Sequence, residues 1–118
     1  MPKILVADDY TSMRVMLCRI LEDAGHDVHA VADGRTALMA HYAKPFDLII
    51  SDFDMPRTNG LELLQAVRYH NSTLPFILFT GAYDPLLAEK AKQADVTRFL
   101  VKPLTTSEIL NAVEECLQ

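Results

Sequence analysis

One stretch decides the fold: Asp47-Leu48-Ile49-Ile50-Ser51-Asp52-Phe53-Asp54-Met55-Pro56. Its three consecutive apolar residues, Leu48 to Ile50, are typical of a central parallel strand that is covered on both faces. Pro56 and Gly60 rule out a simple continuation of that strand. We therefore expect Asp52 to sit exposed at the C-terminal edge of the strand. A lone Asp after a strand is more often a turn or helix-cap residue, so its role depends on the rest of the chain.

Four other apolar segments are predicted to be strands: Ile4 to Ala7, Val28 to Val31, Pro75 to Phe79 and Thr97 to Val101. Apolar spacing from Met13 to Leu21 predicts the first helix, and Asp33-Gly34 precedes a second helix through about Ala43. Capping boxes at Asn59-Glu62 and Thr105-Glu108 predict the starts of the third and fifth helices. Asp84-Pro85 precedes the fourth helix, which runs through about Ala94. Strict alternation requires a parallel sheet with right-handed crossovers and helices on both faces. We predict an α/β fold with a doubly wound five-stranded parallel sheet in the order 2-1-3-4-5.

Helical spacing also predicts where some side chains lie. We expect Leu38 and Tyr42 on the inner face of the second helix. Three methionines are expected to fill the core: Met13, Met16 and Met39. Both cysteines fall at apolar helix positions and are expected to be buried thiols: Cys18 and Cys116. The histidines share no metal-ligand spacing, so we expect solvated or capping roles: His26, His29, His41 and His70.

The composition indicates a single globular domain over residues 1–118. The chain has 118 residues, of which 50% are hydrophobic, and no linker or repeat is visible. Its net charge is −5 and its Lys and Arg residues are scattered, which argues against direct nucleic-acid binding. The first apolar run is too short for a signal peptide, and no run reaches membrane-spanning length. We therefore expect a cytosolic domain without membrane insertion.

Polar side chains gather where the predicted strands end. Asp8 and Asp9 follow the first strand and Asp52 ends the third, and these strands are neighbours in the predicted order, so the carboxylates should converge. Three carboxylates in one crevice repel one another unless a cation lies among them. Because the available ligands are oxygens, Mg²⁺ is favoured, and Mn²⁺ could replace it.

Two further strand ends carry donors. Thr80 follows the fourth strand and Lys102 the fifth. A hydroxyl, the backbone N–H groups after it and an ammonium group are what a phosphoryl group needs during transfer, and Asp52 is available as nucleophile. Each residue alone has an ordinary interpretation: Asp8 as a helix cap, Thr80 as a strand-end hydroxyl, Lys102 as a solvated charge. Their joint occurrence at four strand ends favours a site.

This set of residues closely resembles that of a response-regulator receiver domain of the CheY-like type: Asp8-Asp9, Asp52-Phe53-Asp54-Met55-Pro56, Gly60, Thr80 and Lys102-Pro103. The resemblance covers essentially the whole chain. It implies a flavodoxin-like (βα)5 fold in which Asp52 accepts a phosphoryl group from a phosphohistidine. The implied partners are a sensor histidine kinase or phosphotransfer protein, and a downstream protein target that the sequence does not identify.

The resemblance also implies a role for each residue around the acceptor. Asp9 and Asp52 would bind Mg²⁺ directly, together with the backbone carbonyl of Asp54, whereas Asp8 would act mainly through water. Lys102 would pair with Asp52 and then with the phosphoryl oxygens.

Three more residues would respond to phosphorylation. Thr80 would swing toward the phosphoryl group, which the backbone of Gly81 would also bind. Phe99 matches the family's aromatic switch residue, and its inward packing would reshape the face made by the fourth helix, fifth strand and fifth helix. As an ordinary strand aromatic, Phe99 would have no such role, and the sequence leaves both interpretations open. The Lys102-Pro103 bond is often cis in the family.

The sequence departs from the usual pattern of the family in several places. Gly81 replaces the more usual Ala or Ser, which keeps the backbone donor but loosens the turn. Phe99 lacks the hydroxyl of the commoner Tyr. Asp54 places a carboxylate where family members tune hydrolytic water, which leaves the lifetime of the phosphorylated state open. Residues 93–98 do not reproduce the acidic junction of receivers that dimerise through this face, so we expect a monomer or weak dimer.

Two other functions are compatible with these residues. Asp52-Phe53-Asp54 also matches the acidic pair of haloacid-dehalogenase phosphatases, with Asp54 as general acid, but that superfamily usually carries the pair on its first strand. A phosphorylation-independent interaction module of the same fold is a third hypothesis, and the full acidic, Thr and Lys set argues against it. The leading hypothesis is a signalling switch that catalyses only its own phosphorylation and dephosphorylation.

Overall fold

The computed structural model describes residues 1–118, and five strands alternate with five helices along them. The elements are β1 (Lys3–Ala7), α1 (Thr11–Asp23), β2 (Asp27–Val31), α2 (Gly34–Ala43), β3 (Leu48–Asp52), α3 (Gly60–His70), β4 (Phe76–Thr80), α4 (Pro85–Gln93), β5 (Arg98–Val101) and α5 (Thr106–Leu117). Every predicted strand and helix is confirmed. None of the helices has the length and apolar character needed to cross a bilayer.

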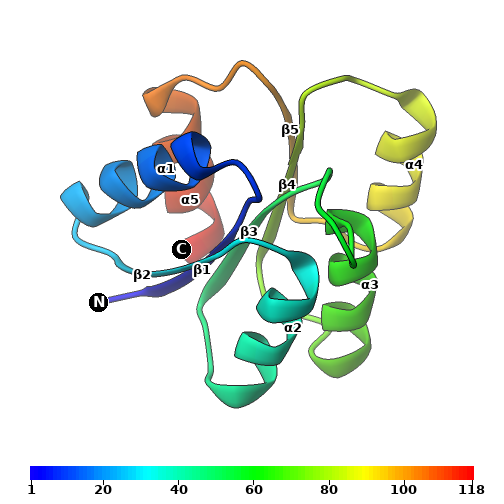
Figure 1. Cartoon of the computed structure of the whole chain (residues 1–118), viewed down its shortest axis with the longest axis horizontal. Coiled ribbons are helices and arrows are strands. Elements are labelled where there is room, and N and C mark those ends of the chain that lie inside the picture. The colour runs from blue at the N-terminus through cyan, green and yellow to red at the C-terminus, as the bar shows by residue number, and fades with distance from the viewer.

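The strands form one parallel sheet in the order β2-β1-β3-β4-β5, as predicted. Figure 1 shows α1 and α5 together on one face of this sheet, and α2, α3 and α4 on the other. The sheet therefore separates two apolar cores. Along β3, Leu48 and Ile50 pack into the α1/α5 core, and Ile49 packs into the opposite core. Because both faces of β3 are covered, its apolar residues run without a break.

Helix caps begin several helices where the chain returns from the carboxyl ends of the strands. Asn59 and Glu62 form the predicted capping box of α3, and Thr105 and Glu108 form that of α5. The Asp84 side chain accepts a hydrogen bond from the N–H of Leu86 at the start of α4. These caps satisfy backbone N–H groups that the first helical turn leaves unpaired.

Several predictions about helix faces are wrong. Tyr42 is 55% exposed rather than facing inward, and Met16 and Met39 are also exposed. In α2 the buried residues are Gly34, Ala37 and His41. Successive helical residues point about 100° apart, so the rotation of the helix about its axis decides which of two adjacent residues faces the core.

The burial of His41 also corrects its expected solvated role. Its Nε2 atom lies 2.9 Å from Nδ1 of His70, so one hydrogen bond joins the last turns of α2 and α3. Packing between these two helices covers His41. Cys116 is buried and Cys18 is half-buried, and both are free thiols.

Candidate functional site

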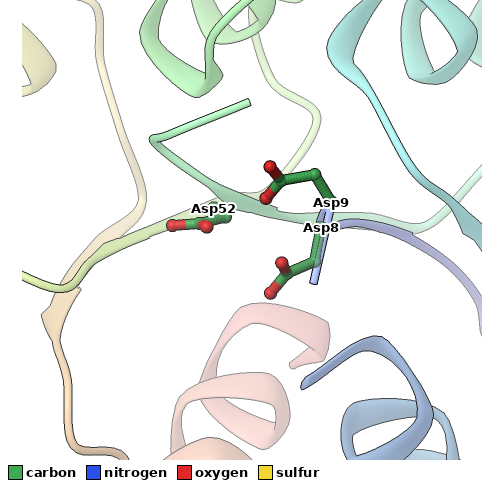
Figure 2. Close-up of side chains that lie close together, drawn as sticks. All are labelled: Asp8, Asp9 and Asp52. Carbon is green, nitrogen blue, oxygen red and sulfur yellow. The ribbon is translucent and has the colours of Figure 1, made fainter. Parts of the chain in front are cut away.

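The carboxyl ends of β1 and β3 bring the three predicted carboxylates together. Ala7 and Ser51 are paired in the parallel register, so the residues after them, Asp8 and Asp52, lie side by side on neighbouring strands. Figure 2 shows Asp8, Asp9 and Asp52 gathered at this edge. One carboxylate oxygen from each residue lies within 4.8 Å of those of the other two. The predicted convergence is therefore present.

The expectation that Asp52 is exposed is wrong, since the residue is only 4% exposed. Pairing with β4 continues beyond it, because the N–H of Phe53 donates to the carbonyl oxygen of Phe79 at 2.8 Å. Asp8 is fully buried, whereas Asp9 is exposed. The cluster thus combines two buried carboxylates with one that faces solvent.

Burial dominates the electrostatics of this cluster. It raises the pKa of Asp52 from 3.8 to about 6; the ammonium group of Lys102 opposes this shift, and the negative charge of Asp8 adds to it. Burial also raises the pKa of Asp8, against a hydrogen bond from the N–H of Tyr10. Without a cation, burial therefore raises the proton affinity of Asp8 and Asp52 above that of exposed carboxyl groups.

One oxygen of the cluster has no partner in the protein. Asp8 Oδ1 accepts from the N–H of Tyr10 at 2.9 Å, but its Oδ2 atom is buried without a hydrogen bond. A buried carboxylate oxygen without a donor is costly, and a nearby cation would offset that cost. The donor set contains only carboxylate oxygens and adjacent backbone, which suits a hard ion such as Mg²⁺. The residues present therefore fit the metal that the sequence predicts.

The neighbouring strand ends supply an ammonium group and a hydroxyl. Lys102 Nζ lies 3.7 Å from Asp52 Oδ2 and 5.2 Å from the ring centroid of Phe79. Thr80 is buried at the end of β4, and its Oγ1 atom contacts the backbone of Ala82, 3.4 Å from the nitrogen and 3.3 Å from the carbonyl oxygen. These contacts are long for hydrogen bonds, so they hold the hydroxyl only weakly. The Lys102–Pro103 peptide bond is cis, as the resemblance implies.

The remaining predicted residues lie around the cluster. Asp54 is exposed in the loop between β3 and α3, and Gly81 is exposed directly after β4. Phe99 is half-buried in β5, where it pairs in register with Leu78 and packs against the core under α2, α3 and α4. The structure therefore brings Asp52 together with the other acidic residues and Lys102, and Phe99 belongs to a separate packing region.

Arg14 takes part in the site although sequence reasoning did not select it. Its Nη1 atom donates to the backbone carbonyl of Asp8 at 2.7 Å, and its charge lowers the pKa of that residue. The sequence signal that could have identified Arg14 is its place in the first turn of the helix that follows the acidic pair Asp8-Asp9. Asp8 itself is not the helix cap, because α1 begins after Tyr10 without a side-chain cap.

Comparison with known proteins agrees with this geometry. The model of the response regulator receiver domain family matches residues 4–114. The chemotaxis protein CheY of Pseudomonas aeruginosa is 34% identical over 119 residues, covering 98% of this chain and 96% of that protein. The sensor protein EvgS of Escherichia coli is 37% identical over 102 residues, covering 86% of this chain and 8% of that protein.

A solved structure extends the comparison to three dimensions. The structure of the Vibrio cholerae chemotaxis protein CheY4 has a TM-score of 0.93 and 36% sequence identity, with 99% of each chain covered. Its similarity spans the whole sheet and all five helices of this chain. The chain therefore belongs to the response regulator receiver domain family and is a receiver domain of two-component signalling.

Proposed function

We propose that this receiver domain is a phosphorylation-activated switch in which Asp52 accepts a phosphoryl group in a Mg²⁺-dependent reaction. The observation that carries the proposal is the buried Asp52 carboxylate, grouped with two other carboxylates and 3.7 Å from Lys102 Nζ. This arrangement combines a nucleophile, a site for a divalent cation and a fixed positive charge. The phosphodonor would be a phosphohistidine on a sensor histidine kinase or a phosphotransfer protein.

The reaction is an in-line transfer between two nucleophiles. An oxygen of the ionised Asp52 attacks the phosphorus, a new O–P bond forms, and the bond from phosphorus to the donor imidazole nitrogen breaks. The second ring nitrogen of the phosphohistidine carries a proton, so the imidazole leaves with the electron pair of the broken bond as a neutral ring. Because the pKa of Asp52 is about 6, most of the carboxyl group is ionised at neutral pH.

Several groups would stabilise the transferred phosphoryl group. Asp9, Asp52 and the backbone carbonyl of Asp54 would hold Mg²⁺, with Asp8 acting through water. The metal would neutralise charge on the phosphoryl oxygens. Lys102, whose Nζ atom lies 3.7 Å from Asp52 Oδ2, supplies a second positive charge.

The Thr80 hydroxyl would carry the change to the surface. It can turn from the backbone of Ala82 toward a phosphoryl oxygen, with the Gly81 N–H as a second donor. That movement would leave space next to β5, and Phe99, now half-buried, could pack further inward. The face of α4, β5 and α5 would then bind a downstream protein.

The proposed activity is confined to the domain itself. Residues 1–118 would act as one receiver domain, as a monomer or weak dimer, without direct nucleic-acid binding. The domain would catalyse its own phosphorylation and dephosphorylation, and the exposed Asp54 side chain would influence how fast water reaches the phosphoryl group.

The test is direct phosphorylation. Purified protein incubated with Mg²⁺ and a small-molecule phosphodonor should gain one phosphoryl group by intact mass spectrometry, and chelation of the metal should prevent the gain. Asp52→Asn should show none, whereas Asp84→Asn, which keeps an exposed helix cap, should behave as the wild type. An unmodified wild-type protein, or equal modification of Asp52→Asn, would refute the proposal.

A further inference from the structure

The loop between β3 and α3, residues Phe53 to Asn59, rests against the first turn of α2. Gly34 is the first residue of α2 and is buried. A Cβ atom built on Gly34 would lie 2.0 Å from the backbone oxygen of Thr58, 2.8 Å from its carbonyl carbon and 2.9 Å from its Cβ atom. These separations are well inside van der Waals contact. Any side chain at this position would therefore displace the loop or the helix.

The β3–α3 loop has little freedom to absorb such a displacement. The N–H of Gly60 donates to the carbonyl oxygen of Phe53 at 2.9 Å, which closes the base of the loop. A Cβ atom on Gly60 would lie 2.3 Å from the backbone oxygen of Asp52, so the base also packs directly on the acceptor residue. The loop is therefore held at the strand end as well as at α2.

The tip of the loop is held in a tight turn. The N–H of Thr58 donates to the carbonyl oxygen of Pro56 at 2.8 Å around Arg57, whose φ is +71°. This is a γ-turn, a strained three-residue conformation that persists only where surrounding contacts hold it. A hydrogen bond from the N–H of Thr36 is the main cause that lowers the pKa of Asp33, and the charge of Arg57 adds to it. Asp33 caps α2 immediately before Gly34.

We infer that Gly34 is a positioning residue for the metal site. Because Gly34 has no side chain, the Thr58 carbonyl packs against the first turn of α2, and this contact fixes the position of the β3–α3 loop. That loop carries the Asp54 backbone carbonyl, four residues before Thr58. The inference rests on the proposed function, since the position of this carbonyl affects metal binding only if it is a ligand. It assigns to α2, which contributes no side chain to the carboxylate cluster, a role in the geometry of the site.

Gly34→Ala tests the inference, with Ala40→Gly as the matched control. The control makes the reverse exchange in the same helix, away from the loop, and should lower stability without moving the metal site. Mg²⁺ affinity is measured by calorimetric titration. In the metal-free protein, the rate of amide hydrogen exchange at Thr58 and Gly60 shows how firmly the hydrogen bonds of the loop are held. Gly34→Ala should weaken Mg²⁺ binding about tenfold, the effect usual for residues that orient a ligand, and should speed exchange at both amides. Ala40→Gly should leave the Mg²⁺ affinity and the exchange rates at Thr58 and Gly60 near those of the wild type.

The possible outcomes separate the inference from its alternatives. Wild-type Mg²⁺ affinity in a folded Gly34→Ala protein would overturn the inference, as would equal losses in Gly34→Ala and Ala40→Gly. If Gly34→Ala does not fold in buffer alone, the exchange measurement is repeated with trimethylamine N-oxide, an osmolyte that favours the folded state. Faster exchange at Thr58 would support the inference, and wild-type exchange would overturn it. If the wild type binds no Mg²⁺, the proposed function fails, and the exchange measurement still shows whether Gly34 sets the loop.

Discussion

Replacing Asp52 by Asn should stabilise the metal-free protein at neutral and alkaline pH. Burial raises the pKa of this carboxyl group from 3.8 to about 6, so the folded protein holds its proton more tightly than the unfolded chain does. The stabilising contribution of the protonated form is fully present below pH 3.8 and is lost as the pH rises through about 6. Above that range the folded state contains a buried charge that Asn would remove.

The size of the effect follows from the same shift. A change in pKa from 3.8 to about 6 corresponds to about 3 kcal/mol, because each pKa unit is worth about 1.4 kcal/mol. Asp52→Asn should therefore raise the free energy of unfolding by about 3 kcal/mol at about pH 8 and by much less at about pH 4. Saturating Mg²⁺ should reduce the difference, because metal binding stabilises the wild type more than the variant.

Urea unfolding followed by far-ultraviolet circular dichroism measures the difference between the two proteins across this pH range. Asp84→Asn serves as the control, because it makes the same chemical change at an exposed residue. The difference curve cancels the contributions of groups that both proteins share. If Asp52→Asn were no more stable than the wild type at high pH, or if the difference did not grow between about pH 4 and pH 8, the reasoning from burial would be refuted.

Three further changes test other contacts. Lys102→Met should raise the pKa of Asp52 above about 6, because the ammonium group now lowers it; a carboxyl-carbon NMR titration measures the value, and an unchanged pKa would contradict the expectation. Arg68→Met should lower the free energy of unfolding by about 2 kcal/mol, since the guanidinium donates to backbone carbonyls before β4 and at Asp95; an unchanged urea midpoint would contradict this. Burial lowers the pKa of His41 from 6.5, so acidification below that value favours the unfolded chain. His41→Phe should reduce that acid-induced loss in thermal unfolding, and a parallel pH profile would refute it.

The order of the elements could be predicted because the signals are local. The apolar run from Leu48 to Ile50 and the capping residue Asn59 depend on neighbours within a few residues. Parallel connections then place every strand's carboxyl end at one edge. The meeting of Asp8 with Asp52 follows from that topology, since β1 and β3 are adjacent and in register.

Packing between distant segments was beyond the reach of these local signals. The pattern of α2 is compatible with either Tyr42 or His41 facing inward, and only contact with α3 selects His41, which bonds to His70. The close contact between the Thr58 backbone and Gly34 likewise joins residues from different segments of the chain. No periodicity in the sequence encodes such a contact.

The sequence by itself determined which chemical groups lie at the strand ends. Each side chain is given by its own position, and the strand order follows from the alternation of strands and helices along the chain. Only the tertiary structure decided how those groups behave. It buries Asp52 within the last rung of β3 and leaves Asp8 Oδ2 without a donor. The physical reason is that a carboxylate's proton affinity depends on the water and charges removed or supplied by segments distant in the chain. A strand-end Asp therefore acquires its raised proton affinity only after its neighbouring strands have assembled around it.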